Sequence, residues 1–416
     1  MGREADQAWL WDQVRWVDAQ RQPRLLSLHA PPGAGASRLA RWLCERTHEL
    51  GGGEILVARH GPAPEPGHGV GPMLAAAFRV ARLAPAAVAE RLHLAGLDRI
   101  DARGLAAVLR PDQAEHPVRS PTERHRLVEA GLRCLAARRT LVLWLDDIGH
   151  DADTIALALH LERARDLPVL VLATGAPADL VPRAQQRHLD VLSAEAIETV
   201  VRRSLGLTPA VVEAVVRRAG GSPRFALELL AWLVTAEKLR ASPRGLAAPR
   251  SVLDALPSDL QGAYRAHVDA VAPGATDALR LAALLGSHVP ETEWAAGCLS
   301  LGLSRSDDDL DALLRGGLLR TVPGGYTFGH EDLRRAMAQG DDAVATRWHR
   351  TLAAIVDSPE RQAHHLLAAH EPAAAIQPLA EAAREAQAQG ASRRAEQLLR
   401  RQLEALDASG APANDL

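Results

Sequence analysis

The sequence predicts an α/β fold in which a parallel sheet is followed by a long, mainly helical region. Largely apolar runs at 24–28, 140–145 and 168–173 alternate with amphipathic stretches, which is typical of a parallel sheet covered on both faces. After about residue 190 the strand pattern stops and helical periodicity dominates. With 416 residues, 47% hydrophobic and 24% charged, the chain can bury several cores, and disorder over its whole length is excluded.

Charge and hydropathy exclude several classes of protein. The net charge is -3, so the chain has no global basic field for binding DNA through bulk charge. No apolar run approaches the ~20 residues of a membrane helix, and the start MGREADQAW has no apolar signal core. Cys44, Cys134 and Cys298 lie far apart, as free thiols do. We therefore expect a cytoplasmic protein without a membrane partner.

The first part of the chain alternates helices and strands in order. We expect helices at 6–19, 38–50, 72–109 with breaks, 122–137 and 154–165, strands at 24–28, 55–58, 140–145 and 168–173, and loops at 61–71 and 111–121. The second part is helical over 193–240, 253–317 and 344–407, with a linker at 241–250 and a β-hairpin at 318–328.

This pattern predicts four parts. A helix ending at Gly316-Gly317 and followed by a hairpin is the layout of a winged helix, and the stretches 373–389 and 392–406 resemble one tetratricopeptide-type helix pair. We expect an α/β domain over 1–190, a helical lid over 191–245, a winged-helix-like domain over 246–342 and a TPR-like region over 343–416.

The glycine-rich turn after the first strand is half of a phosphate-binding motif. That motif needs G-x-x-x-x-G-K and then serine or threonine, so that backbone amides cradle phosphates while the lysine reaches the β- and γ-phosphates. The window 30–37 reads APPGAGAS, in which Gly35 and Ser37 match, but Ala30 and Ala36 replace the first glycine and the lysine. The side chain of Arg38 should leave the helix in a different direction from that of the missing lysine, so we do not expect it to replace the lysine. The alternative is a tight strand-to-helix turn.

Two acids end the strand at 140–145. Asp146, beside the phosphate loop, is placed to hold Mg²⁺ through water, and Asp147 is placed to orient an attacking water. The alternative is a helix N-cap or a solvated turn. Together with the glycine-rich turn, the acids favour a P-loop nucleotide domain.

Five segments in chain order resemble the STAND class of AAA-like signalling ATPases, the bacterial group related to maltose-regulon-type activators and to AAA modules attached to kinases and cyclases. They are GRE at the start, PPGAGAS, LVLWLDDIGHDADTIALALHL, GGSPRFALELL and GYTFGHEDLRRAM. The resemblance covers nearly the whole chain, and the order of the five is more specific than any one of them.

The resemblance implies a role for each matching residue. Arg3 would lie near the nucleotide base, Pro223 would contact adenine, and His330 would approach a phosphate in the closed state. The phosphate loop would comprise Gly33, Ala34, Gly35, Ala36, Ser37 and Arg38, with Ser37 and Asp146 on Mg²⁺ and Asp147 as the catalytic acid. Pro223 could equally start a helix, and His330 could be a surface histidine.

The departures from the motif bear on function. Ala36 removes positive charge from the place where γ-phosphate charge must be stabilised, so we expect impaired hydrolysis. The resulting hypothesis is a regulatory switch that binds ATP or ADP with Mg²⁺ weakly, or a pseudo-ATPase scaffold. We expect it to act on an effector protein through its C-terminal helices, and to be related to longer proteins. The alternatives are a slow ATPase and a DNA-binding regulator, and the acidic start of 307–315 disfavours DNA.

Overall fold

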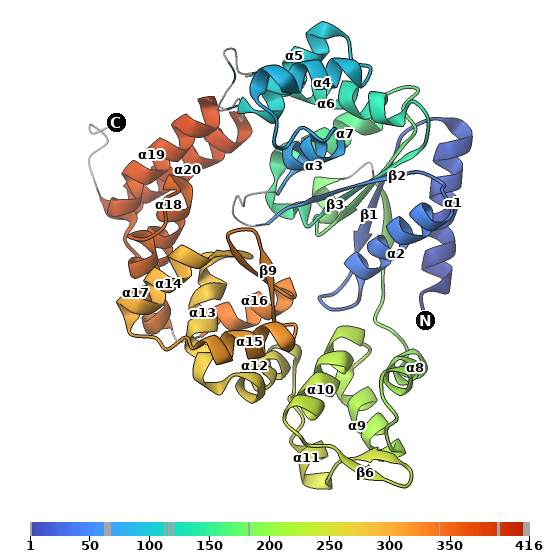
Figure 1. Ribbon diagram of the computed structural model, residues 1–416, viewed down its shortest axis with the longest axis vertical. Helices are drawn as coiled ribbons and strands as arrows, with labels where there is room; N and C mark the ends of the chain where they lie inside the picture. Colours follow the sequence, from blue (N-terminus) through green and yellow to red (C-terminus); the bar gives the residue numbers. More distant parts are fainter. Residues whose placement is uncertain are drawn as a thin grey trace.

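A computed structural model describes residues 2–61, 68–111, 114, 118, 120–181, 184–340, 342–388 and 392–410. Its centre is a five-stranded parallel sheet in the order β2-β3-β4-β1-β5 (Figure 1). The strands are β1 (Arg24–His29), β2 (Glu54–Arg59), β3 (Leu141–Asp146), β4 (Val169–Thr174) and β5 (Gln185–His188). The predicted parallel sheet is therefore confirmed.

Alternate residues of the strands enter two hydrophobic cores. On one face, Leu26, Val142 and Leu170 pack against α1 (Glu4–Gln20) and α2 (Ala36–Glu49). The opposite face packs against α3 (Val70–Ala77), α4 (Pro85–Leu94), α5 (Arg99–Leu109), α6 (Pro121–Ala136) and α7 (Ala152–Glu162). We call the sheet with these helices the phosphate-loop domain. Burial on both faces explains why the central strands β3 and β4 are apolar at all positions but the last.

The sheet topology places the predicted site. β4 lies between β1 and β3, and all three run in the same direction, so their carboxyl ends meet at one edge of the sheet. The glycine-rich loop follows β1, the acid pair ends β3, and Thr174 ends β4.

Two details of the strands differ from the sequence expectations. A fifth strand, β5, was not expected and pairs with β1 at the edge of the sheet. Its residues QQRH are polar and mostly exposed, so they carry no hydrophobic signal. The expected linker at 241–250 also contains an antiparallel hairpin of β6 (Arg240–Ser242) and β7 (Gly245–Ala247). Gly245, with φ of 111°, opens the second strand of this hairpin.

Three helices follow the sheet and have their own core. These are α8 (Ala194–Ser204), α9 (Pro209–Ala219) and α10 (Pro223–Thr235), and we call them the lid helices. Val201, Val215 and Leu229 are fully buried among them. The short helix α11 (Arg250–Asp254) then leads to the next group.

The next group has the element order of a winged helix, and we call it the hairpin unit. It comprises α12 (Leu260–Val271), α13 (Thr276–Leu285), β8 (His288–Pro290), α14 (Glu291–Leu301), α15 (Asp307–Arg315), β9 (Leu319–Val322), β10 (Gly325–Phe328) and α16 (Glu331–Ala338). β8, β10 and β9 form one antiparallel sheet, which contains the predicted hairpin. Trp294 is fully buried at the centre of this unit.

Four more helices follow within the described residues: α17 (Asp342–Ala353), α18 (Pro359–Ala368), α19 (Pro372–Ala388) and α20 (Ser392–Ser409). The expected pair corresponds to α19 and α20, and its expected break at 390–391 lies outside the described residues. The four helices run from the hairpin unit back toward the phosphate-loop domain, where α20 contacts α7 (Figure 1). Across the described residues, no helix combines the length and apolar character that crossing a membrane requires.

Candidate nucleotide site

The glycine-rich loop has the conformation of an anion cradle. Gly33 has φ of 77° and Gly35 has φ of 105°, a region that favours glycine. Gly35 is the N-cap of α2, so the unpaired amides of the first helical turn face the end of β1. Amides and helix dipole together favour a bound anion. The described loop thus presents the backbone part of a phosphate site.

Ser37 and Asp146 meet beside this loop, as the sequence predicted. The Ser37 hydroxyl donates a hydrogen bond of 3.2 Å to Asp146 Oδ1. The same oxygen accepts a 2.7 Å bond from the hydroxyl of Thr174, and that hydroxyl accepts from Trp144 Nε1 at 3.1 Å. The carboxylate is therefore fixed by groups from α2 and β4.

Asp147 is held against the hairpin unit. Its backbone has φ of 57°, and its Oδ2 lies 3.4 Å from Arg335 Nη2 on α16. A Cβ on Gly175 would come within 2.5 Å of Asp147 Oδ1, so glycine is required after β4 to leave room for this acid. The predicted catalytic acid is thus an ion-pair partner in this arrangement.

Arg3 and Arg38 have different surroundings. Arg3 Nη2 donates to the carbonyl of Ala34 at 3.0 Å and to the carbonyl of Asp190, so it joins the N-terminus, the phosphate loop and the segment after β5. Arg38 lies 3.7 Å from Glu45 and its side chain is 72% exposed. It points away from the loop, in line with the predicted bearing.

Pro223 occupies the first turn of α10, directly after the N-cap Ser222. The Ser222 hydroxyl donates to the carbonyl of Gly33 at 3.4 Å and accepts from Phe225 N at 3.2 Å. A Cβ on Gly33 would lie 2.8 Å from Ser222 Oγ. The start of α10 therefore contacts the phosphate loop through Ser222, the neighbour of Pro223.

His330 is the N-cap of α16, directly after the β9–β10 hairpin. Its side chain makes no capping hydrogen bond. Burial by surrounding protein, and then the charges of Arg224, Arg320 and Arg41, lower the pKa of His330 to about 4. The ring is therefore neutral at pH 7 and faces a positive surrounding.

Several contacts at the site were missed by sequence reasoning. They involve Thr174, His60, Ser222, Arg224 and Arg335. His60 is buried, and its Nδ1 lies 3.2 Å from the carbonyl oxygen of Asp146. Only Thr174 could have been predicted from the sequence, because it is the polar end of an apolar strand that lies between β1 and β3. The positions of the other four residues depend on which distant segments pack together.

The oxygen atoms present suit a magnesium ion that arrives with a nucleotide. Hydroxyl and carboxylate oxygens of Ser37 and Asp146 are hard ligands, and Mg²⁺ is usually held by one or two protein groups together with phosphates. Within the described ranges, no three His, Cys, Asp or Glu residues are grouped to hold a metal by themselves. The oxygen ligands of Ser37 and Asp146 therefore fit an Mg²⁺ ion that is bound together with a nucleotide.

Comparisons with known proteins point to the same architecture. No protein-family description and no curated protein matches the sequence. A solved STAND protein with a tetratricopeptide repeat sensor from Pyrococcus horikoshii aligns at 11% identity with a TM-score of 0.52, over 95% of this chain and 54% of that one. The chain has the fold of a STAND-class P-loop ATPase. It spans about half the length of that STAND protein.

Two further solved structures align less well. A Walker-type ATPase of Pyrococcus abyssi has 12% identity and a TM-score of 0.37, over 81% of this chain and 95% of that one. Cdc6p of Pyrobaculum aerophilum has 13% identity and a TM-score of 0.36, over 84% and 93%. At these identities the comparison concerns the fold, and function has to be argued from the site.

Proposed function

We propose that the chain is a nucleotide-binding regulatory switch that takes ATP or ADP with Mg²⁺ at the glycine-rich loop. The observation that supports this most is the Ser37–Asp146 hydrogen bond beside a helix N-terminus capped by Gly35. Phosphate binding needs the amides, and Mg²⁺ needs the two oxygens. Arg3 and Ser222, the neighbour of Pro223, both contact this loop, and the resemblance places the base near Arg3 and Pro223.

We also propose that hydrolysis is impaired. Mg²⁺, when bound, neutralises phosphate charge, but Ala36 adds none from the protein. The acid that would orient a water, Asp147, is paired with Arg335. An acid whose oxygen lies against an arginine has to leave that contact before it can orient a water. Both observations favour a switch or scaffold over a slow ATPase.

Output is proposed to pass to an effector protein through the C-terminal helices. Leu399 and Leu403 lie one turn apart on α20 and are 40% and 54% exposed. Binding of DNA through the hairpin unit is disfavoured, because α15 begins with Asp307, Asp308 and Asp309.

Calorimetric titration of ATP and ADP, with and without Mg²⁺, tests the proposal. We expect saturable binding by the wild type, and a Mg²⁺-dependent loss of about tenfold or more in Asp146→Asn, since a charge-assisted contact is worth about 1.5–3 kcal/mol. The matched control is Glu213→Gln, whose carboxylate on α9 is 77% exposed. This control should bind as the wild type does.

Phosphate release under excess ATP completes the test. We expect no turnover above background, whereas rates of about 1 s⁻¹, the low end for enzymes, would refute impaired hydrolysis. Binding that is absent for both nucleotides, or equal in wild type and Asp146→Asn with Mg²⁺, would refute the nucleotide switch.

A further inference from the structure

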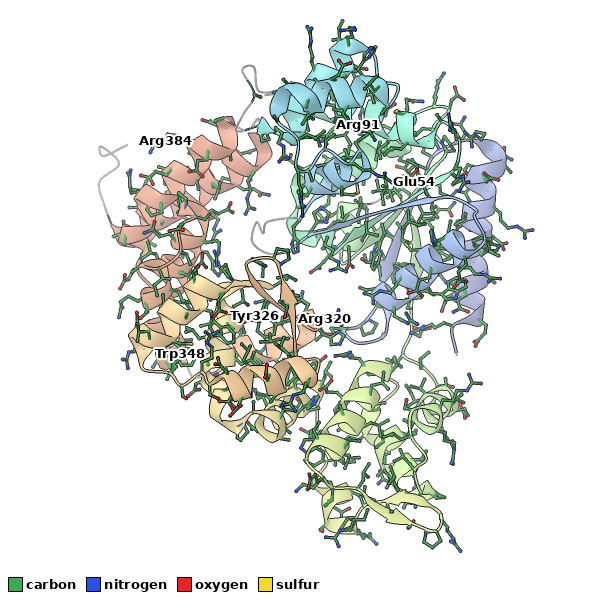
Figure 2. All side chains as sticks on the ribbon, viewed as in Figure 1. Glu54, Arg91, Arg320, Tyr326, Trp348 and Arg384 are labelled. Atoms are coloured by element: carbon green, nitrogen blue, oxygen red, sulfur yellow. The ribbon has the colours of Figure 1, made fainter. Side chains whose placement is uncertain are left out.

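A buried histidine lies directly beyond the edge strand β2. This strand begins at Glu54, which is labelled in Figure 2, and ends at Arg59, so His60 is the next residue along the chain. Arg59 is paired with Asp146 across the β2–β3 ladder. His60 is 8% exposed. It therefore lies beside the point at which β3 ends in the acid pair.

Two donors of His60 reach one carbonyl oxygen. The backbone N–H of His60 donates to the carbonyl oxygen of Asp146 at 2.9 Å, and the ring Nδ1 lies 3.2 Å from the same oxygen. A carbonyl oxygen can only accept, so Nδ1 carries a proton and donates it. This carbonyl belongs to the peptide between Asp146 and Asp147. His60 thus fixes the orientation of the peptide that joins the two acids.

The orientation of this peptide determines the backbone conformation of Asp147. Its φ of 57° lies in the left-handed region, which a residue with a Cβ keeps only where its surroundings hold it there. Because the peptide is planar, its rotation changes the ψ of Asp146 and the φ of Asp147 together. The hydrogen bonds from His60 oppose that rotation.

The conformation held in this way places both carboxylates. A Cβ on Gly175 would lie 2.7 Å from the Cα of Asp147, so the backbone of this acid packs closely against the end of β4. Its Oδ2 faces Arg335 at 3.4 Å. On the other side of the peptide, Asp146 Oδ1 accepts from Ser37. A rotated peptide would disturb both arrangements.

The second ring nitrogen of His60 is anchored at the start of α7. Nε2 lies 3.0 Å from the Thr154 hydroxyl and 3.6 Å from Asp151 Oδ2. Asp151 caps α7 by accepting from Thr154 N at 2.9 Å. The ring therefore spans from the end of β3 to the first turn of α7, and contacts both ends of the loop that carries Asp147.

We propose that His60 is a positioning residue that orients the peptide between Asp146 and Asp147, and so holds both acids in place for a nucleotide bound with Mg²⁺. This inference rests on the proposed nucleotide site and adds a residue that acts on it through a carbonyl group. The Nδ1 donor carries this role, whereas Nε2 holds the ring in place. A role in packing would depend on the volume of the side chain instead.

Two substitutions separate these roles. His60→Asn keeps an amide N–H at the position of Nδ1 but leaves a larger void. His60→Gln fills more space and places its amide where Nε2 lies, but it has no donor at the position of Nδ1. The matched control is His93→Asn on α4, where Nδ1 lies 2.8 Å from the carbonyl oxygen of Leu97. Circular dichroism checks that all three variants fold.

Hydrogen exchange of the segment 147–155 tests the positioning without any ligand. The amides of Asp151, Thr154 and Ile155 are hydrogen-bonded in this segment. We expect exchange about tenfold faster in His60→Gln than in the wild type, and within about threefold of the wild type in His60→Asn and the control. Packing alone predicts the opposite order of the two His60 variants, because asparagine is the smaller side chain.

Titration of ATP with Mg²⁺, and with EDTA in its place, tests the link to the nucleotide site in the same four chains. We expect His60→Gln to lose about tenfold in affinity for MgATP, and the affinity for metal-free ATP to change less than about threefold. His60→Asn and the control should bind MgATP as the wild type does.

The outcomes separate this inference from the function on which it rests. Equal exchange in all four chains, or faster exchange in His60→Asn than in His60→Gln, refutes the positioning role. If the wild type and both His60 variants bind MgATP equally well, the positioning role is refuted and the nucleotide switch stands. If exchange follows the predicted order but no chain binds ATP, the switch is refuted, and the orientation of the two acids by His60 stands.

Discussion

At the scale of single residues, one side chain separates this loop from a complete phosphate-binding motif. Ala36 opens α2 directly after Gly35, and both the amide cradle and the Ser37–Asp146 contact are present without a lysine. The backbone shape therefore does not depend on the missing charge. It depends on glycine at positions 33 and 35, where φ is positive.

Ala36→Lys should accordingly restore nucleotide affinity. The position lies at the helix start, at the mouth of the loop, so we expect a change in unfolding free energy within about 1 kcal/mol. ATP affinity should rise about tenfold or more, and MgATP should raise the melting temperature further than in the parent. Adding Asp146→Asn should remove that rise. A lysine variant that folds but shows no response to millimolar ATP would mean either that Ala30 has closed the cradle or that the site is purely structural, and the scaffold would then replace the switch.

Sequence reasoning reached the residues of this site that lie in continuous motifs. Ser37 and Asp146 could be placed together because parallel strands end at one edge of the sheet. Arg224 and Arg335 could not, since their positions at the loop depend on how the lid helices and the hairpin unit dock on the sheet. Long-range packing of this kind leaves no local pattern.

At the scale of elements, apolar patterns predicted the central strands and most helices. The edge strand β5 was missed because an edge strand has one neighbour and tolerates the polar sequence QQRH. The β6–β7 hairpin was missed because strands of three residues are too short for periodicity to show. The helices α17 and α18 were expected, but the histidine contact between them was not.

Histidines at the contact of α17 and α18 should make the protein sensitive to acid. His365 is 1% exposed, and its Nδ1 lies 2.9 Å from Nδ1 of His349. Burial, then His364, His349 and Arg361, lower the pKa of His365 to about 2. Burial and then His364 lower the pKa of His349 to about 4.

The sign follows from proton binding. Below pH 6.5 the unfolded chain binds protons that the folded chain excludes, so the free energy of unfolding falls as pH drops from about 6.5 toward 4, by up to about 1.4 kcal/mol per pH unit for each histidine. Urea unfolding between pH 7 and 5 measures this. In His365→Gln the free energy of unfolding should fall less steeply with decreasing pH than in the parent. In the exposed control His48→Gln it should fall as steeply as in the parent. Equal slopes in all three chains would contradict the explanation.

At the scale of the whole molecule, two kinds of interface differ in strength. The lid helices and the hairpin unit share apolar packing, since Leu260 contacts both cores, and they also share the buried pair Glu228–His267. Their contacts with the phosphate-loop domain include the half-exposed Arg335–Asp147 pair and the Ser222–Gly33 hydrogen bond. Half-exposed ion pairs contribute little, whereas breaking a buried pair costs several kcal/mol.

Opening of the nucleotide site should therefore separate the phosphate-loop domain from the lid helices and hairpin unit together. Leu189 belongs to a core of the phosphate-loop domain and Leu192 belongs to the core of the lid helices. The backbone between these two residues is therefore the expected hinge. A ligand that contacts both sides would favour the closed arrangement by its extra affinity for that state.

The most direct test of this account is the distance between spin labels on either side of that interface, measured with and without MgATP. Cysteines replacing the exposed residues Glu49 on α2 and Arg315 on α15 would carry the labels, in a Cys134→Ser background where Cys44 and Cys298 are buried. We predict a broad distribution without ligand that narrows to the closed distance with MgATP, and no narrowing in Asp146→Asn. A distribution that MgATP leaves unchanged, in a chain that calorimetry shows to be saturated, would contradict a nucleotide-held switch.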